Sequence, residues 1–466
     1  MAGVGFKLTK YFSKKNVSGN ISGALYSVII SSGPWLITVL AVGFVTIFAR
    51  DFLSHGDLTL LRSIICYTYA ISLIVFGFIE MPVTRYLADK LYINDVYTFK
   101  NLYLILAASV TIILTFFGFI FYYSTFEGDI LTYFLTVYFL IFVALIWLAM
   151  IFLSAAKNFH PIIISFLFGG LISVLASKYF GEAYGFVGCL AGFVSGQFFT
   201  ALSLSASLFL EFKGKQYHSF EITSYFKNNK RLVLVGLFYY LGIWADKAVF
   251  WYSSVGEQVR GVLYTNQYYD TAMFLSYLTI VPTLAVFLVK VETDFYIHYS
   301  YYFSSILNKK SLTFLNSARE DIVSSLRGAI TVLFKIQLAV TIPVWLFASQ
   351  IIIFLDLPGL MEPIFRFGVL GSFLQGNFLI FNIILLYFER KKLVLKNYFI
   401  FFILNFSLSY ISIYLGVQYH GLGYASACLI VAILSYIDLN KTLNELHMRT
   451  FLGQPLDQKD MVDFKL

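Results

Sequence analysis

Residues 397–437 read NYFIFFILNFSLSYISIYLGVQYHGLGYASACLIVAILSYI, and none of these 41 residues carries a charge. A helix needs about 20 predominantly apolar residues to cross the roughly 30 Å of hydrocarbon in a bilayer. The stretch is therefore long enough for two membrane-spanning helices, and Gly416–Gly423 (GVQYHGLG) supplies a turn between them. This pattern predicts an all-α polytopic membrane protein.

The composition of the whole chain supports the same class. Of its 466 residues 59% are hydrophobic and only 12% are charged, whereas soluble domains have roughly 45–50% apolar and about 25% charged residues. The 51 Phe and 34 Tyr exclude a disordered chain, which could not bury so many aromatic rings. The net charge of +8 could indicate a nucleic-acid partner in a soluble protein. In a membrane protein, basic cytoplasmic loops account for it, so we predict no nucleic-acid partner.

Uncharged runs along the chain predict twelve membrane-spanning helices in two bundles of six. The first bundle, residues 16–210, contains the runs 16–49, 63–79, 101–126, 130–156, 158–177 and 183–210. A charged cytoplasmic linker, residues 211–231, leads to the second bundle, residues 232–445. Its spans are 232–253, 271–289, 336–355, 367–388 and the two halves of 397–437.

The distribution of basic residues predicts the orientation. With a cytoplasmic N-terminus, 26 of the 33 Lys and Arg residues fall on the cytoplasmic side and only four fall outside. This bias predicts that both termini are cytoplasmic. We further expect residues 1–15 to form a basic amphipathic helix on the inner leaflet, and residues 446–466 to be a cytoplasmic tail. In the long cytoplasmic loop 290–327, Tyr299 and Phe303 share one face of a helix, which we interpret as lying on the membrane rather than docking a partner.

Two charged residues, Asp246 and Lys247, lie inside the predicted seventh span, where hydrocarbon cannot hydrate them. Residues 239–251 read YYLGIWADKAVFW, and Asp246 lies about 21 Å into the span at 1.5 Å per residue, past the midplane. A charge at that depth costs roughly 2.5–3.5 kcal/mol on insertion scales, so it usually faces a cavity or a partner. Neighbours on a helix point about 100° apart, and we therefore expect that Asp246 and Lys247 do not simply neutralise each other.

Helical spacing places aromatic residues beside these charges. Tyr240, Trp244, Lys247 and Trp251 share one face, and Tyr239 shares the adjacent face with Asp246. Aromatic rings beside fixed polar groups could stack against sugars while hydroxyls find acceptors, which predicts a substrate path along this helix. The alternative is an interhelical ion pair with ordinary aromatic packing, and both interpretations stay open.

Other polar residues in spans are weaker candidates. Glu80, near the inner end of the second span, and Asp270, near the outer end of the eighth, are predicted gate residues. Gln375 and Asn382 lie seven residues apart on one face of the tenth span. Two interpretations are open: these side chains line the substrate path, or they form interhelical hydrogen bonds.

The remaining sequence features favour a transporter over an enzyme. Pro34 and Pro282 interrupt the first and eighth spans and are predicted hinges. No HExxH, GxSxG or Walker motif is present, and the three cysteines are scattered in apolar runs. We therefore expect no catalytic residue, no metal site and no cofactor. Six plus six helices joined by a cytoplasmic linker is typical of transporters built from repeated halves.

Several motifs together resemble a known family. They are MAGVGF (1–6), SSGPW (31–35), EMPVTRYLADK (80–90), YLGIWADK (240–247), Pro282 and VETDFY (291–296). These resemble the PelG family of Pel exopolysaccharide transporters, which is placed with the multidrug/oligosaccharidyl-lipid/polysaccharide flippases. The resemblance implies a MATE-like fold in the bacterial inner membrane.

The resemblance also implies a function and partners. The chain would move a galactosamine-type polymer from cytoplasm to periplasm for the biofilm matrix, with a cytoplasmic glycosyltransferase and other membrane subunits of the Pel synthesis complex, including the cyclic-di-GMP receptor. One alternative is a flippase of lipid-linked oligosaccharides, for which Lys247, Lys335 and Arg366 would meet pyrophosphate. Another is an ion-coupled multidrug antiporter with Asp246 as the ion site. Polymer elongation and an ion gradient both remain possible as the energy source.

Overall fold

A computed structural model describes residues 17–93, 95–212 and 221–452. The predicted amphipathic helix of residues 1–15 lies outside the described residues, as do parts of the predicted linker and tail. The described chain is almost entirely helical, because nearly every segment between its loops is apolar and long enough to satisfy its backbone hydrogen bonds internally.

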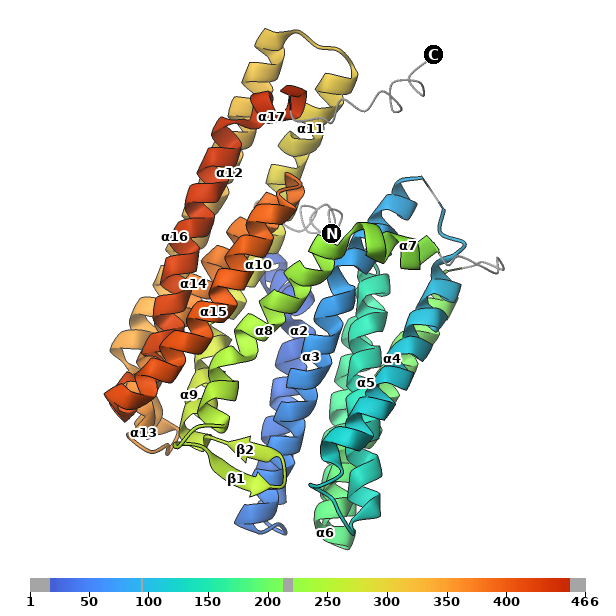
Figure 1. Ribbon diagram of the computed structural model, residues 1–466, viewed down its shortest axis with the longest axis vertical. Helices are drawn as coiled ribbons and strands as arrows, with labels where there is room; N and C mark the ends of the chain where they lie inside the picture. Colours follow the sequence, from blue (N-terminus) through green and yellow to red (C-terminus); the bar gives the residue numbers. More distant parts are fainter. Residues whose placement is uncertain (1–16, 94, 213–220, 453–466) are drawn as a thin grey trace.

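The first half of the chain forms one helical bundle (Figure 1). Its helices are α2 (Val17–Ala49), α3 (His55–Tyr92), α4 (Phe99–Tyr122), α5 (Ile130–Ala155) and α6 (His160–Glu211). A short helix inside the predicted linker, α7 (Glu221–Asn228), leads to the second half.

The second half contains the remaining helices and one small sheet. Its elements are α8 (Lys230–Trp251), β1 (Glu257–Arg260), β2 (Leu263–Thr265), α9 (Gln267–Tyr277), the 3₁₀ turn η1 (Leu278–Ile280), α10 (Val281–Val289), the π-helical turn η2 (Lys290–Phe295), α11 (Tyr296–Leu307), α12 (Leu312–Leu346), α13 (Ala348–Phe354), α14 (Met361–Tyr387), α15 (Lys391–Leu415), the 3₁₀ turn η3 (Val417–Tyr419), α16 (Leu422–Asn444) and α17 (Leu446–Leu452). The turn predicted at 416–423 is confirmed, since α15 ends at Leu415 and α16 begins at Leu422.

The described residues contain eleven helices that are long and apolar enough to cross a membrane. One of them, the 52-residue α6, reverses direction at Gly185, whose φ of 62° and ψ of −138° are not helical. The two segments then pack against each other, with Ser177 Oγ donating to Cys189 O (3.0 Å) and Ser173 Oγ to Phe193 O (3.1 Å). This reversal confirms that the region contains two segments, but it falls at Gly185, inside the predicted span 183–210 and a few residues after the predicted boundary at 178–182. The total of twelve spans stays a prediction.

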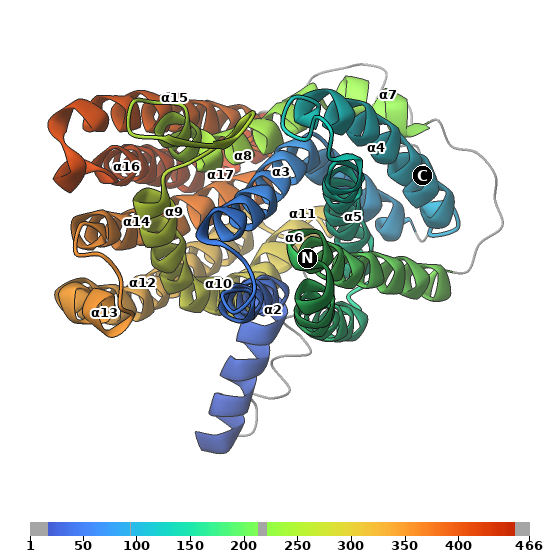
Figure 2. The same ribbon diagram turned by 90° about the horizontal axis from the view of Figure 1, so that it is seen from below.

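The two halves meet along two helix pairs. Figure 2 shows α3 beside α8 and α2 beside α10, and these pairs are in contact. Gly77 of α3 and Gly236 of α8 permit the closest approach, because a Cβ at Gly236 would lie 2.2 Å from the Gly77 carbonyl oxygen. Small residues let membrane helices approach closely and gain van der Waals contact.

The segment 290–327 differs from the prediction of a loop with a membrane-lying helix. It consists of η2, α11 and the first turns of α12, which continue the neighbouring spans as a helical hairpin (Figure 1). Tyr299 donates to the carbonyl oxygen of Tyr387 (2.9 Å), and Tyr299 and Phe303 both pack on the core of the second half. The prediction that this face lies on the membrane is wrong, because the chain itself covers it.

Candidate substrate path between the two halves

Asp246 of α8 lies in a fully buried polar network. Its carboxylate accepts hydrogen bonds from the Tyr269 hydroxyl (2.7 Å), from Asn405 Nδ2 (3.2 Å) and from Lys247 Nζ (3.1 and 3.2 Å). The network thereby joins α8 to α9 and α15. The expectation that Asp246 and Lys247 do not neutralise each other is wrong, because the flexible lysine side chain folds back to reach its neighbour.

Lys247 is held from several sides. Its ammonium group also donates to the Tyr277 hydroxyl (3.1 Å) and to the Ile243 carbonyl (3.1 Å), and it lies 4.8 Å from the centroid of the Tyr277 ring. Hydrogen bonds and a cation–π contact of this kind compensate a buried ammonium for its lost hydration. We infer that the charged pair holds α8 in place against α9 and α15.

The aromatic face of α8 meets aromatic residues of the first half. The ring centroids of Tyr240 and Phe76 are 6.1 Å apart, and those of Phe76 and Trp147 are also 6.1 Å apart. Trp244 packs against the hydrophobic cluster of the first half, and its buried indole N–H has no hydrogen-bond partner among the described residues. The predicted stripe therefore lies at the contact between the halves.

Trp251 continues this face toward the outer end of α8. Its ring stacks on Tyr67 of α3 with centroids 4.5 Å apart. Together with Tyr69, whose ring is 6.3 Å from Trp147, these residues form an aromatic band across α3, α5 and α8. We use aromatic band for the following residues: Tyr67, Tyr69, Phe76, Trp147, Tyr240, Trp244 and Trp251.

The predicted gate residue Glu80 lies at one end of this band. It accepts a hydrogen bond from the Tyr240 hydroxyl (2.9 Å), which joins α3 to α8. One turn and a half further along α3, Arg85 forms an ion pair with Glu389 of the α14–α15 turn (2.6 Å). Both contacts connect the first half to the second, on the side of the band toward Lys230, where α8 begins.

The second predicted gate residue, Asp270, organises the opposite end. Its carboxylate accepts from Trp251 Nε1 (2.9 and 3.0 Å), from Thr265 Oγ1 (2.9 Å) and from the Asn266 backbone N–H (3.3 Å). Asp270 therefore ties the end of the aromatic band to the base of the strand pair β1–β2.

The β1–β2 hairpin reaches across to the first half, a contact that sequence reasoning missed. The Val262 N–H donates to Thr125 Oγ1 (3.2 Å), and the Tyr264 N–H donates to the Tyr67 hydroxyl (3.1 Å). Arg260 also lies 3.8 Å from a carboxylate oxygen of Asp129. Glycines flanking an alternating run in GEQVRGVLYT (256–265) were the signal that could have predicted a hairpin.

The other path candidates lie within the second half. The Tyr239 ring packs against Tyr398, with centroids 5.0 Å apart. Gln375 accepts from the Tyr424 hydroxyl, while Asn382 donates to Ser435 Oγ (2.8 Å) and accepts from Asn397 (3.1 Å). Both amides are buried, and these bonds are interhelical, although Asn382 also donates to the Phe378 carbonyl of its own helix (2.8 Å).

The two prolines occupy different helix positions. Pro34 lies inside α2, where its carbonyl accepts from Thr38 Oγ1 (2.9 Å). Pro282 lies in the first turn of α10, directly after the 3₁₀ turn η1. Proline suits the first turn of a helix because no amide hydrogen is needed there. Their hinge role stays a prediction.

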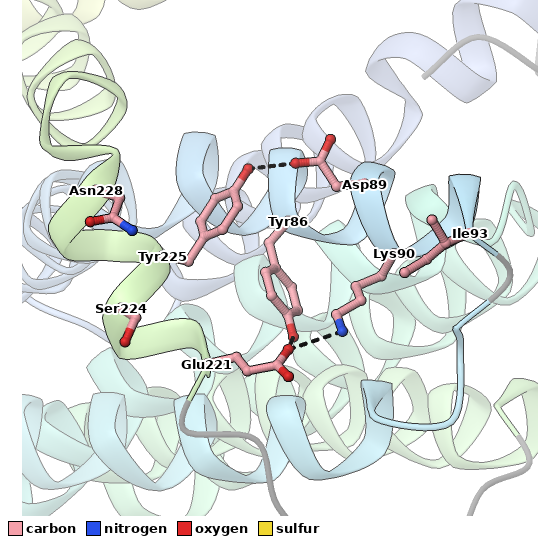
Figure 3. Close-up of a pocket in the computed structure, with 8 residues that line it drawn as sticks. All are labelled: Tyr86, Asp89, Lys90, Ile93, Glu221, Ser224, Tyr225 and Asn228. Atoms are coloured by element: carbon pink, nitrogen blue, oxygen red, sulfur yellow. Dashed lines mark hydrogen bonds and ion pairs between the residues drawn. The ribbon is translucent and has the colours of Figure 1, made fainter. Parts of the chain in front are cut away.

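A cavity of about 460 Å³ lies between α3 and α7 and is lined by none of the aromatic-band residues (Figure 3). Lys90 lies 2.9 Å from the Glu221 carboxylate, and the Tyr225 hydroxyl donates to Asp89 (2.8 Å). The hydrogen bond and charge of Lys90 lower the pKa of Glu221 below its usual value. These contacts fasten α7 to α3. No group of three or more potential metal ligands occurs in the described parts of the chain.

Solved structures of MOP superfamily transporters share this fold. An outward-facing MATE family transporter of the MOP superfamily has a TM-score of 0.60 and 16% identity, covering 91% of this chain and 96% of its own. An inward-facing one has a TM-score of 0.60 and 15% identity, covering 88% and 95%. A MOP superfamily transporter from Pyrococcus furiosus gives 0.62 and 14%, covering 90% and 96%.

The family assignment rests on the sequence. A comparison with curated proteins gives no match. The family model PelG, described as "Putative exopolysaccharide Exporter (EPS-E)", matches residues 1–451, which is nearly the whole chain. The chain therefore belongs to the PelG family.

Proposed function

We propose that this multi-pass membrane protein exports an exopolysaccharide across the bacterial inner membrane along the contact between its two halves. The family description names an exopolysaccharide exporter, and the fold is that of MATE-type transporters. Both favour transport over catalysis.

The aromatic band is the observation that carries the proposed path. It brings rings from α3, α5 and α8 together between the halves, where neighbouring centroids are 4.5–6.3 Å apart. When the halves separate, these rings become two facing aromatic surfaces on which sugar rings can stack by their C–H faces. The buried, unpartnered indole N–H of Trp244 is then free to donate to a sugar hydroxyl.

The contacts at the two ends of the band are the proposed gates. Glu80–Tyr240 and Arg85–Glu389 close the end near α7, and the β1–β2 hairpin with Asp270 closes the other. The Glu80–Tyr240 and Arg85–Glu389 contacts each join the two halves, and Asp270 holds the hairpin that contacts the first half. The two halves can therefore separate only if these contacts break. The hydrogen bonds and exposed ion pairs involved are individually weak, about 0.5–1.5 kcal/mol each, which suits a contact that opens repeatedly. Pro34 and Pro282 are the proposed bending points.

Asp246 and Lys247 have a positioning role in this proposal. Asp246 is fully buried and Lys247 nearly so, and the two are bonded to each other and to α9 and α15. They therefore fix the direction of the α8 aromatic face without touching the polymer. Tyr239, Gln375 and Asn382 support the same helix packing from within the second half.

The substrate and partners are inferred from the family. We propose a galactosamine-type polymer, made by a cytoplasmic glycosyltransferase and delivered through other membrane subunits that include the cyclic-di-GMP receptor. A neutral, acetylated polymer suits a path lined by aromatic rings rather than by free charges.

Two alternatives have less support from the geometry. A flippase for lipid-linked oligosaccharides needs free basic residues in its cavity, but Lys247 is paired with Asp246 and Arg366 with Glu362 (2.9 Å). Of the three candidates only Lys335, an exposed residue of α12, forms no ion pair in the described chain. An antiporter with its ion site at Asp246 needs a carboxylate that is available, and this one is already bonded to an ammonium group.

The host provides the decisive experiment. Deleting the gene and feeding labelled hexosamine should abolish secreted polymer without accumulation of a solvent-extractable, lipid-linked sugar. Accumulation of the lipid-linked form would show a flippase instead, and unchanged secretion would overturn the proposal.

A variant pair tests the path itself. Trp244→Ala in the complementing gene should lower export at least tenfold while leaving the protein in the membrane. Trp345→Ala is the matched control, because Trp345 lies on α12 and packs on Arg366 away from the band. Equal export by the two variants would remove the aromatic band from the mechanism.

A further inference from the structure

Helices α8 and α15 run side by side in the same direction (Figures 1 and 2). The Phe238 and Phe399 rings meet edge to face with centroids 5.0 Å apart, and one turn further along Asn405 Nδ2 donates to the Gly242 carbonyl (2.8 Å). Counting back eight residues from each phenylalanine gives Lys230 and Lys391, where the two helices begin. The two helices therefore start at the same level.

A groove of about 380 Å³ lies between these helices near their first turns. Its walls are apolar and its rim is basic, and it is lined by Phe238, Lys392, Leu395, Lys396 and Phe399. Seven residues separate Lys392 from Phe399, or about 10 Å along a helix axis. This distance matches the separation between the phosphate of a phospholipid and the upper part of the acyl chains of the same lipid.

The groove opens toward lipid. Lys392 and Lys396 lie on the same face of α15 as a stripe of exposed apolar side chains that follows at helical spacing. The stripe consists of Phe399 (45% exposed), Ile403 (45%), Phe406 (51%) and Tyr410 (48%). In a membrane span such a face contacts acyl chains, while Gly236 and Tyr240 turn the other face of α8 toward α3.

The charge at the rim is positive and partly uncompensated. Lys396 pairs with Asp438 (2.7 Å) and Lys391 with Glu389 (3.0 Å). Across the parts of the chain that the structure describes, Lys392 forms no ion pair, and neither do Lys230 and Arg231 at the start of α8. The unpaired charge of Lys392 therefore favours an anionic ligand.

We propose that this groove binds an anionic phospholipid of the cytoplasmic leaflet. Its phosphate contacts Lys392 and Lys396, and its glycerol and upper acyl chain lie along Phe238 and Phe399. Because the lipid bridges α8 and α15, it stabilises the helix that carries the path residues of the second half. The site is independent of the polymer and of the direction of transport.

Native mass spectrometry of the full-length protein tests the proposal. We expect palmitoyl-oleoyl phosphatidylglycerol to bind at least fivefold more tightly than phosphatidylcholine with the same chains. Lys392→Gln should lower the affinity for phosphatidylglycerol about fivefold, the typical contribution of one basic residue near an anionic surface. Asp438→Asn, which frees Lys396 from its counter-charge, should raise it.

The matched control is Lys309→Gln with Lys310→Gln. These two lysines are also exposed and expected on the cytoplasmic side. They lie in the turn between α11 and α12 and do not line the groove. This variant should bind phosphatidylglycerol as the unchanged protein does. Equal binding of the two lipids, an unchanged affinity in Lys392→Gln, or an equal loss in the control would each overturn the proposal.

Photolabelling keeps the test independent of variant folding. A phosphatidylglycerol with a diazirine in its acyl chain should label peptides of α8 and α15 that contain Phe238 or Phe399 in the unchanged protein. Labelling confined to other helices would refute the site. Displacement of the lipid by millimolar inorganic phosphate would show a simple anion site and refute lipid recognition.

Discussion

Replacement of Asp246 by asparagine is the sharpest test of the buried network. The carboxylate has no exposed surface and accepts bonds from Tyr269, Asn405 and Lys247. In Asp246→Asn the Lys247 ammonium stays buried and loses its counter-charge, because the Tyr277 hydroxyl, the Ile243 carbonyl and the new amide are neutral groups. Removing one partner of a buried ion pair costs about 3–5 kcal/mol, and we expect a loss of stability of this size.

A double variant distinguishes a positioning role of the Asp246–Lys247 pair from a direct action of either residue on the polymer. Asp246→Asn with Lys247→Gln removes both charges, so neither position is left with a buried charge that lacks its partner. We therefore expect the double variant to be more stable than either single variant, with a coupling free energy of at least about 2 kcal/mol between the two positions.

Two measurements check this prediction. Thermal unfolding of the four purified proteins in one detergent gives the double-mutant cycle, and secretion of labelled polymer gives export. Because we assign the pair a positioning role, the double variant should recover both stability and export. Additive losses would refute the pairing, and a stable double variant without export would show that Asp246 or Lys247 acts on the polymer.

Three further perturbations have definite outcomes. Gly236→Ala should separate α8 from α3 and reduce export, because the new Cβ meets the backbone of Gly77; Gly43→Ala, with open space around it, is the control in an export assay. Gly261→Ala forces an L side chain into a φ of +55° and against the neighbouring loop, and should cost about 1–3 kcal/mol in thermal unfolding. Glu221 has a lowered pKa in the folded protein, so its bond to Lys90 stabilises the docking of α7 above the ordinary carboxyl pKa and is lost as pH falls through the lowered value; limited proteolysis near α7 should accelerate over that acidic range, and Glu221→Gln should abolish this dependence.

The uncharged runs of the sequence were enough to predict the helical membrane fold and the position of several spans. Helices α14, α15 and α16 lie where their uncharged runs predict, and α6 reverses at Gly185, a few residues past the predicted boundary at 178–182. This succeeds because insertion into hydrocarbon depends on the composition of about 20 consecutive residues, which is a local property. The PelG resemblance was also readable at this level, in motifs such as YLGIWADK (240–247).

The sequence identified the special residues of α8 but not their partners. Asp246 and the aromatic stripe were found from their depth and helical spacing. The pairing of Asp246 with Lys247 was predicted wrongly, because helical direction ignores how far a lysine side chain can bend. The prediction of a membrane-lying helix in segment 290–327 was wrong for a related reason. The apolar face of an amphipathic helix is covered equally well by a membrane or by the rest of the chain.

Only the tertiary structure decided which groups meet. Asn405 reaches Asp246 from 159 positions away, Tyr240 reaches Glu80 from 160, and Tyr264 reaches Tyr67 from 197. In a membrane the apolar surface of a helix is satisfied by lipid as well as by protein, so hydropathy does not select its neighbours. The selection comes from close contact at small residues such as Gly77 and from hydrogen bonds that hydrocarbon cannot replace, and both depend on the complete arrangement of the helices.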